Sequence, residues 1–147
     1  MVKAEASVMI DRPVEEVWKF IIDLSKVPTW NTSISDVRQT STGPLGVGST
    51  YDFKEKTMNA TISMRIIEYE PNRRWSFEHT SGPSKGTILT LSVETIEGKT
   101  RLTEDHDIKL NGFYKLLRLF ITSSRIRKYL VVGLGNAKRI LESEAKS

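Results

Sequence analysis

The chain opens with strict alternation of apolar and polar residues. Apolar side chains occupy every second position from Val2 to Ile10, with Lys3, Glu5 and Ser7 among the residues between them. Successive side chains of a strand point to opposite faces, so this spacing predicts a strand with one buried face.

Helical spacing follows. Pro13 suits the first position of a helix, because the N–H that it lacks would have no partner there, and Glu15 and Glu16 suit the positive end of the helix dipole. Ser25 can cap a second short helix, and Pro28 limits how far the first one runs. We expect a helix-turn-helix bracket that closes one end of a sheet and ends at Trp30. The apolar face of the first helix consists of Val14, Val17, Trp18, Ile21 and Ile22.

Between Ser33 and Ile108, short alternating runs are separated by turn-forming pairs, a pattern that predicts an antiparallel meander. The pairs are Gly43-Pro44, Met58-Asn59, Pro71-Asn72, Gly82-Pro83 and Gly98-Lys99. One face of each run is expected to point inward. The inner faces comprise Tyr51, Phe53 and Glu55; Ile62, Met64 and Ile66; Trp75, Phe77 and His79; Leu89, Leu91 and Val93; and Leu102, Glu104, His106 and Ile108.

Five inner-face positions hold ionisable side chains: Tyr51, Glu55, His79, Glu104 and His106. A buried carboxylate beside an imidazole can act as a general acid or base, because burial and neighbouring charge move pKa values toward neutrality. The same groups can instead only orient a ligand through hydrogen bonds. A third possibility is structural, since a one-residue slip or a bulge would turn Glu104 and His106 outward and bring Asp105 and Asp107 inward.

The stretch from Phe113 to Ala145 contains no proline and predicts a long terminal helix, about 50 Å if unbroken. Thr122-Ser123-Ser124 falls between its two apolar halves, so the helix is either continuous or broken near Ser123. The first half is unusually apolar. We expect the wrapping sheet to bury it; the alternatives are a mobile gate over a pocket and a surface that meets a partner or membrane. The apolar spacing is carried by Phe113, Leu116, Leu117, Phe120, Leu130, Leu134, Ala137 and Leu141.

The length and composition of the chain indicate one domain and exclude several kinds of site. A length of 147 residues suits a single domain spanning residues 1–147. Cysteine is absent, which excludes disulfides, thiolate metal sites and thiol nucleophiles. His79 and His106 lie too far apart for the close spacing of zinc-enzyme motifs, and Gly46-Val47-Gly48 lacks the third glycine of a dinucleotide loop. We therefore expect neither a metal nor a cofactor.

The net charge of +4 is modest, and many basic residues fall in the terminal helix, where we interpret them as a solvated face rather than as a site for nucleic acid or anionic lipid. No run of about eighteen apolar residues is present. The first ten residues lack the apolar region of a secretory signal, so we expect a cytoplasmic protein. It is expected to be a monomer or a homodimer.

A single long helix is narrower than the sheet it must cover, so the predicted arrangement is expected to leave a pocket. Trp18 is interpreted as core, whereas Trp30 lies at the end of the bracket, where the pocket mouth would be. The candidate ligand-binding residues are Trp30, Tyr51, Phe53, Met64, Phe77, His79, Leu91, Glu104, His106 and Phe120.

Several short motifs occur in a characteristic order. They are Ile10-Asp11-Arg12-Pro13-Val14-Glu15-Glu16-Val17-Trp18, then Asp23, Pro28-Thr29-Trp30, Gly46-Val47-Gly48 and Ile67-Glu68-Tyr69-Glu70-Pro71-Asn72-Arg73-Arg74, followed by the lone terminal helix. Together they resemble the polyketide cyclase/dehydrase branch of the START-like superfamily over nearly the whole chain. The resemblance implies an α+β helix-grip fold. In that fold a curved seven-stranded antiparallel sheet wraps around the long C-terminal helix, two short helices lie between the first two strands, and a hydrophobic cavity lies between sheet and helix.

Such scaffolds host carriers, receptors, allergens, cyclases and quinone-binding proteins, so the resemblance assigns no catalytic residue. Our leading hypothesis is binding or transport of a small hydrophobic ligand, whether lipid, aromatic or polyketide-like, in a cavity of roughly 300–1,000 Å³. The second is a cyclase or dehydratase in which His79, Glu104 or His106 moves protons. The third is an interaction protein that docks through Phe113 to Ile121.

Overall fold

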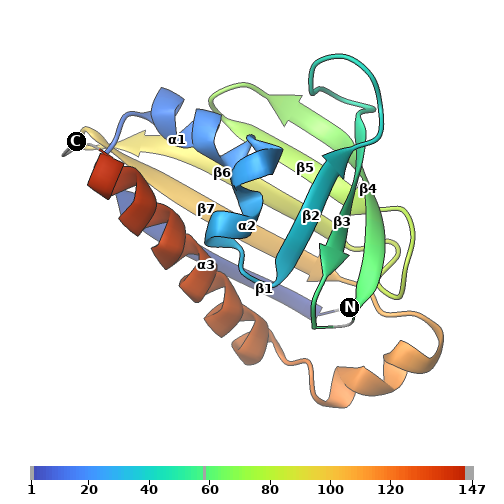
Figure 1. Cartoon of the computed structure of the whole chain (residues 1–147). Coiled ribbons are helices and arrows are strands. Elements are labelled where there is room, and N and C mark those ends of the chain that lie inside the picture. The colour runs from blue at the N-terminus through green and yellow to red at the C-terminus, as the bar shows by residue number, and fades with distance from the viewer. Residues whose placement is uncertain (1, 58, 145–147) are drawn as a thin grey trace.

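A single antiparallel sheet dominates the computed structural model, which describes residues 2–57 and 59–144 (Figure 1). Its seven strands lie in the order β1-β7-β6-β5-β4-β3-β2, so the chain from β2 to β7 is a meander, and β1 pairs with β7. The predicted turns separate strands as expected, although Met58 lies outside the described residues. The strands are β1 Val2–Ile10, β2 Ile34–Gln39, β3 Thr50–Glu55, β4 Ala60–Glu70, β5 Arg74–His79, β6 Ile88–Ile96 and β7 Lys99–Ile108.

Short helices form the predicted bracket between β1 and β2. The α-helix α1 (Val14–Ile21) starts after Pro13, the 3₁₀ helix η1 spans Leu24–Lys26, and α2 (Val27–Trp30) ends at Trp30. The cap of η1 differs from the prediction. Asp23, not Ser25, is the capping residue, and its carboxylate accepts hydrogen bonds from the Ser25 N–H at 3.1 Å and from the Ser25 hydroxyl at 2.6 Å.

Alternation along the strands places the expected side chains on the inner face. Leu102, Glu104 and His106 of β7 are all buried, and their register neighbours on β6 include Leu89 and Leu91. The register slip considered above, which would have turned Glu104 and His106 outward, does not occur. A strand with one buried face resists such a slip because it would expose every apolar side chain.

A bulge in β4 changes the alternation partway along the strand. The register with β5 shifts between Ile66 and Glu68, so the parity that buries Ile66 does not continue. Beyond the bulge Tyr69 turns toward the core and packs against Trp18 of α1, with 5.7 Å between ring centroids. The bulge therefore joins the inner face of the sheet to the bracket.

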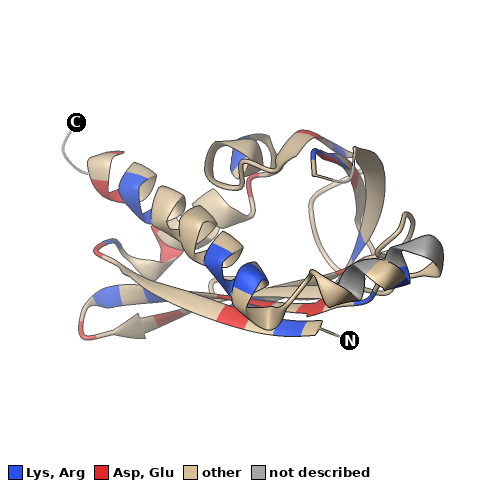
Figure 2. Ribbon diagram, turned by 90° about the horizontal axis from the view of Figure 1, so that it is seen from below, with Lys and Arg blue, Asp and Glu red and all other residues tan. Residues whose placement is uncertain are grey.

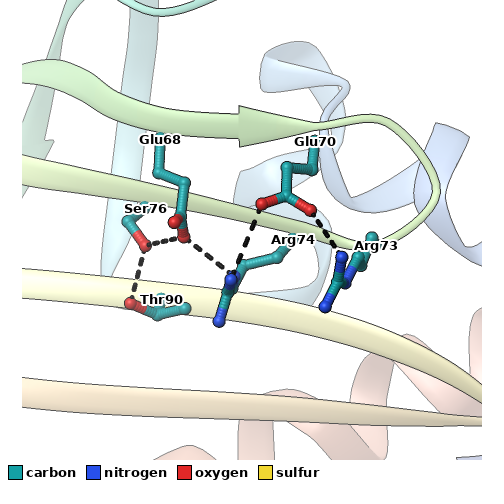
Figure 3. A network of polar contacts seen from close by, with 6 residues as sticks. All are labelled: Glu68, Glu70, Arg73, Arg74, Ser76 and Thr90. Atoms are coloured by element: carbon teal, nitrogen blue, oxygen red, sulfur yellow. Dashed lines mark hydrogen bonds and ion pairs between the residues drawn. The ribbon is translucent and has the colours of Figure 1, made fainter.

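Polar side chains hold β4, β5 and β6 in register after the bulge (Figure 3). The Glu68 carboxylate lies 2.9 Å from Arg74 Nε and accepts a 3.3 Å hydrogen bond from the Ser76 hydroxyl, which lies 2.8 Å from that of Thr90. Along β5, Arg74 and Ser76 alternate with Trp75 and Phe77. The network on one face of the strand therefore fixes Trp75 and Phe77 on the inner face.

The long helix α3 (Ser123–Glu144) covers the sheet beside β1 (Figure 1). Its C-terminal half is tied to the end of β1, because Lys138 Nζ donates to the Met9 carbonyl at 2.7 Å and the Asp11 N–H donates to Glu142 at 2.9 Å. One face of α3 is buried at helical spacing, as predicted. The buried residues are Ile126, Leu130, Leu134, Ala137 and Leu141.

The terminal helix is broken where the sequence left the question open. The Thr122 hydroxyl accepts the Arg125 N–H at 3.2 Å and so caps α3, and the preceding 3₁₀ helix η2 spans Gly112–Leu119. Gly112 has φ +59°, a left-handed conformation that favours glycine, and η2 projects away from the sheet in Figure 1.

The expected burial of the first apolar half is therefore wrong for three of its residues, whereas Ile121 at its end is partly buried against the core. Leu116, Leu119 and Phe120 are exposed to 62%, 81% and 61%. The side chains of Phe113 and Leu117 lie outside the described part of the structure. The segment follows the end of β7 at Ile108 and forms η2 rather than a further strand.

Basic side chains gather on the first turns of α3, which are blue in Figure 2. Arg125, Arg127 and Lys128 of these turns are exposed to solvent.

Among the described residues, none of the helices combines the length and the apolar character needed to span a bilayer.

Candidate functional site

A pocket of about 200 Å³ lies inside the curve of the sheet. Strands β2 to β7 all contribute to its wall, together with the bracket and the start of α3. Most of the lining is apolar, and the volume is smaller than the range expected from the sequence. Representative apolar wall residues are Ile21 and Val27 from the bracket, Phe53, Met64, Phe77 and Leu91 from the sheet, and Ile121 before α3.

The structure brings nine of the ten candidate ligand-binding residues to this pocket. They are Trp30, Tyr51, Phe53, Met64, Phe77, His79, Leu91, Glu104 and His106. Phe120 is the exception: it is exposed, and its neighbour Ile121 occupies the wall instead. The break before α3 explains the difference, because Phe120 follows η2 outward rather than continuing the buried face of α3. As expected, Trp18 is core and does not line the pocket.

A carboxylate and an imidazole meet on β7. His106 Nε2 donates to Glu104 Oε2 at 3.0 Å, and both side chains are at least nine-tenths buried. The two residues stand two positions apart on one strand and so share its inner face. A carboxylate has about four acceptor sites, so Glu104 retains acceptor capacity for another group.

His79 is the second buried imidazole of the wall. Its Nδ1 lies 2.7 Å from the Ser84 hydroxyl, its ring meets Phe53 edge-on at 5.9 Å, and its Nε2 has no hydrogen-bond partner among the described residues. Burial, with a smaller contribution from the charge of His106, lowers the pKa of His79 from 6.5 to about 4. The His79 ring is therefore neutral at pH 7.

Two buried indoles add further polar groups to the wall. The Nε1–H groups of Trp30 and Trp75 lack partners among the described residues, and both side chains line the pocket. The position of Trp30 depends on α3. A Cβ at Gly133 would come within 3.5 Å of the Trp30 carbonyl, which accepts a 3.2 Å hydrogen bond from Asn136. α3 thus contacts the end of the bracket at Gly133 and Asn136.

Tyr129 of α3 contributes a hydroxyl that the sequence reasoning missed. It hydrogen-bonds Ser33 and Asn31, and all three residues line the pocket. Burial is the main cause that raises its pKa to about 12, so the phenol stays protonated. A smaller recess of about 30 Å³ shares Trp30, Asn31, Glu104 and Tyr129 with the main pocket.

A signal for Tyr129 does exist in the sequence. Tyr129, Gly133 and Asn136 follow helical spacing and form a small and polar stripe beside the apolar face of α3. Ser84 could not be found from periodicity, because it lies in the loop after Gly82-Pro83, where neither strand nor helix spacing applies.

A protein-family model described as "Polyketide cyclase / dehydrase and lipid transport" matches residues 1–142. The chain belongs to this family. The resemblance in the sequence motifs is thereby confirmed, as is the α+β architecture that it implied. No curated protein matches the sequence significantly.

Solved structures share the family fold at low sequence identity. The protein TTHA0849 from Thermus thermophilus has a TM-score of 0.78 and 15% identity, covering 97% of this chain and 98% of that one. XoxI from Bacillus cereus has a TM-score of 0.71 and 17% identity, with 96% of each chain covered. The Aha1 dimer from Colwellia psychrerythraea has a TM-score of 0.64 and 18% identity, with 94% and 97% covered. At such identities the likeness concerns the fold alone.

Proposed function

We propose that this protein binds a small hydrophobic molecule in the pocket enclosed by its sheet. The observation that carries the proposal is the distribution of the lining: apolar and aromatic side chains form most of the wall, and a few polar groups stand among them. This is the general composition of small-molecule sites, where the apolar surface supplies affinity and the polar groups supply orientation. Membership of a family described by polyketide and lipid chemistry supports the same class of ligand.

The volume limits the size of the ligand. A dry apolar cavity of about 150 Å³ can hold benzene. A pocket of about 200 Å³ therefore suits a molecule of one or two rings, or a short acyl chain, rather than a whole phospholipid.

Calorimetric titration with 2-naphthol tests the proposal, with tryptophan fluorescence as a second readout. Trp30 and Trp75 line the pocket, so binding should change their emission. Leu91→Trp fills the pocket and should abolish binding, whereas Leu91→Met keeps the volume and should retain it. Absence of heat and of any emission change with the wild-type protein would refute the proposal.

An enzyme of the dehydratase type is a second candidate, favoured by the neutral imidazole of His79 in the same wall as the Glu104–His106 pair. One buried group would take the proton next to a ketone, and another would protonate the hydroxyl that leaves as water. Incubation with 3-hydroxy-1-tetralone is a suitable assay, because loss of water yields 1-naphthol, which fluoresces. Turnover that disappears in both His79→Gln and Glu104→Gln supports this candidate; binding without turnover excludes it for this substrate class.

The exposed segment before α3 supports a third role. Leu116, Leu119 and Phe120 are exposed beside the basic residues Lys115 and Arg125, a combination that suits the surface of an anionic bilayer. Sedimentation with phosphatidylcholine vesicles, with and without phosphatidylserine, tests it. The double variant Leu119→Ser/Phe120→Ser should lose binding, whereas Val47→Ser, at another exposed apolar residue, should not.

A further inference from the structure

The charge of the pocket wall is one-sided. Among the described side chains, none of those that line the pocket is lysine or arginine, whereas two are glutamates, Glu55 and Glu104. A ligand with its own negative charge would meet no compensating cation there, and burying an unpaired charge is costly.

Glu104 is a buried carboxylate acceptor of the wall. Its side chain is nine-tenths buried, and it lies in both the main pocket and the smaller recess. Like charges repel strongly in a medium of low dielectric, so a carboxylate or phosphate beside Glu104 is disfavoured. A hydroxyl can instead donate a charge-assisted hydrogen bond to it, which is about twice as strong as a neutral one.

The unpartnered atom of His79 favours the same kind of group. With Nδ1 on the Ser84 hydroxyl, Nε2 is a donor in one neutral tautomer and an acceptor in the other. A ligand hydroxyl can pair with Nε2 in either case, because it both donates and accepts. A carboxylate can pair with only one of the two tautomers.

The indole N–H groups of Trp30 and Trp75 are donors only, and neither has a partner among the described residues. A hydroxyl oxygen can accept from an indole while its proton goes to an acceptor of the wall. The lining thus offers donors and acceptors without a positive charge.

We infer that the pocket selects an uncharged ligand bearing a hydroxyl group, an alcohol or a phenol, over one bearing a carboxylate or phosphate. This inference rests on the proposed function, since it concerns the same pocket. It names Glu104 as the residue that discriminates between the two ligand classes, through its negative charge.

Three ligands of nearly equal shape test the inference: 2-naphthol, 2-methylnaphthalene and 2-naphthoate. Calorimetry at pH 7 should show that 2-naphthol binds about tenfold more tightly than 2-methylnaphthalene. Its advantage over 2-naphthoate should be larger than about tenfold. Binding of 2-naphthoate as tightly as 2-naphthol would overturn the inference and leave the proposed function intact. Failure of all three to bind would refute the proposed function itself.

Glu104→Gln isolates the charge, because glutamine keeps the size of the side chain. In this variant 2-naphthol should bind more weakly and 2-naphthoate more tightly. The dissociation constant of 2-naphthoate divided by that of 2-naphthol should therefore fall about tenfold. Glu94→Gln, on the exposed end of β6, should leave the ratio unchanged. A ratio that stays the same in Glu104→Gln, with the fold verified by circular dichroism, would show that Glu104 does not discriminate.

Discussion

The buried imidazole of His79 makes the stability of this protein depend on pH in a defined way. The side chain is 7% exposed, and burial lowers its pKa from 6.5 to about 4. The unfolded chain therefore takes up a proton near pH 6.5 that the folded chain does not accept until about pH 4. The stability associated with the neutral ring is complete above pH 6.5 and is lost as the pH falls toward 4.

The magnitude follows from these two values. One pKa unit corresponds to about 1.4 kcal/mol, so acidification from pH 7 to pH 5 should lower the free energy of unfolding by about 2 kcal/mol through His79 alone. Continuing to pH 4 should bring the loss to about 3 kcal/mol. Other groups also titrate in this range, so the effect of His79 must be obtained by difference.

Urea unfolding of the wild type and of His79→Gln at pH 7, 6 and 5 provides that difference. Glutamine does not titrate and can still hydrogen-bond the Ser84 hydroxyl. The wild-type advantage over the variant should shrink by about 2 kcal/mol between pH 7 and pH 5. If the two proteins lose stability in parallel, His79 is not held neutral by burial and the reasoning fails.

Three further predictions concern α3. Leu134→Ala, at a fully buried position, should lower the free energy of unfolding by about 2–5 kcal/mol. Val131→Ala, at an exposed position, should change it by less than about 0.5 kcal/mol. Equal effects of the two substitutions would contradict the placement of the buried face of α3. Thr122→Ala should cost about 1 kcal/mol and Thr122→Ser almost nothing, measured by thermal unfolding, if the hydroxyl caps α3. Gly133→Val should shift the emission of Trp30 by pushing α3 away from its carbonyl, and an unchanged spectrum would argue against that close approach.

Strand alternation made most of the site predictable. Tyr51, Phe53, His79 and Glu104 reach the pocket because each lies on a strand with one buried face, and a period of two then fixes which side chains point inward. The bulge after Ile66 was not predicted. A bulge inserts one unpaired residue without a distinctive sequence pattern, so its position becomes visible only when β4 is paired with β5.

Helical spacing was less informative about the terminal segment. It identifies residues that share a face, but it does not say what covers that face. Phe120 was therefore grouped with the residues of the pocket, whereas the Thr122 cap starts a new helix and leaves Phe120 outside. Tyr129 was missed for the converse reason, because its hydrogen-bond partners Asn31 and Ser33 come from a distant part of the sequence.

The indole signals of the three tryptophans offer the most direct test that the pocket is the ligand site. In a ¹H–¹⁵N spectrum titrated with 2-naphthol, the Nε1–H resonances of Trp30 and Trp75, which line the pocket, should shift, and that of Trp18, which packs against Tyr69, should stay in place. Shifts confined to Trp18, or no shift at any of the three while the ligand binds, would place the ligand elsewhere and contradict the account.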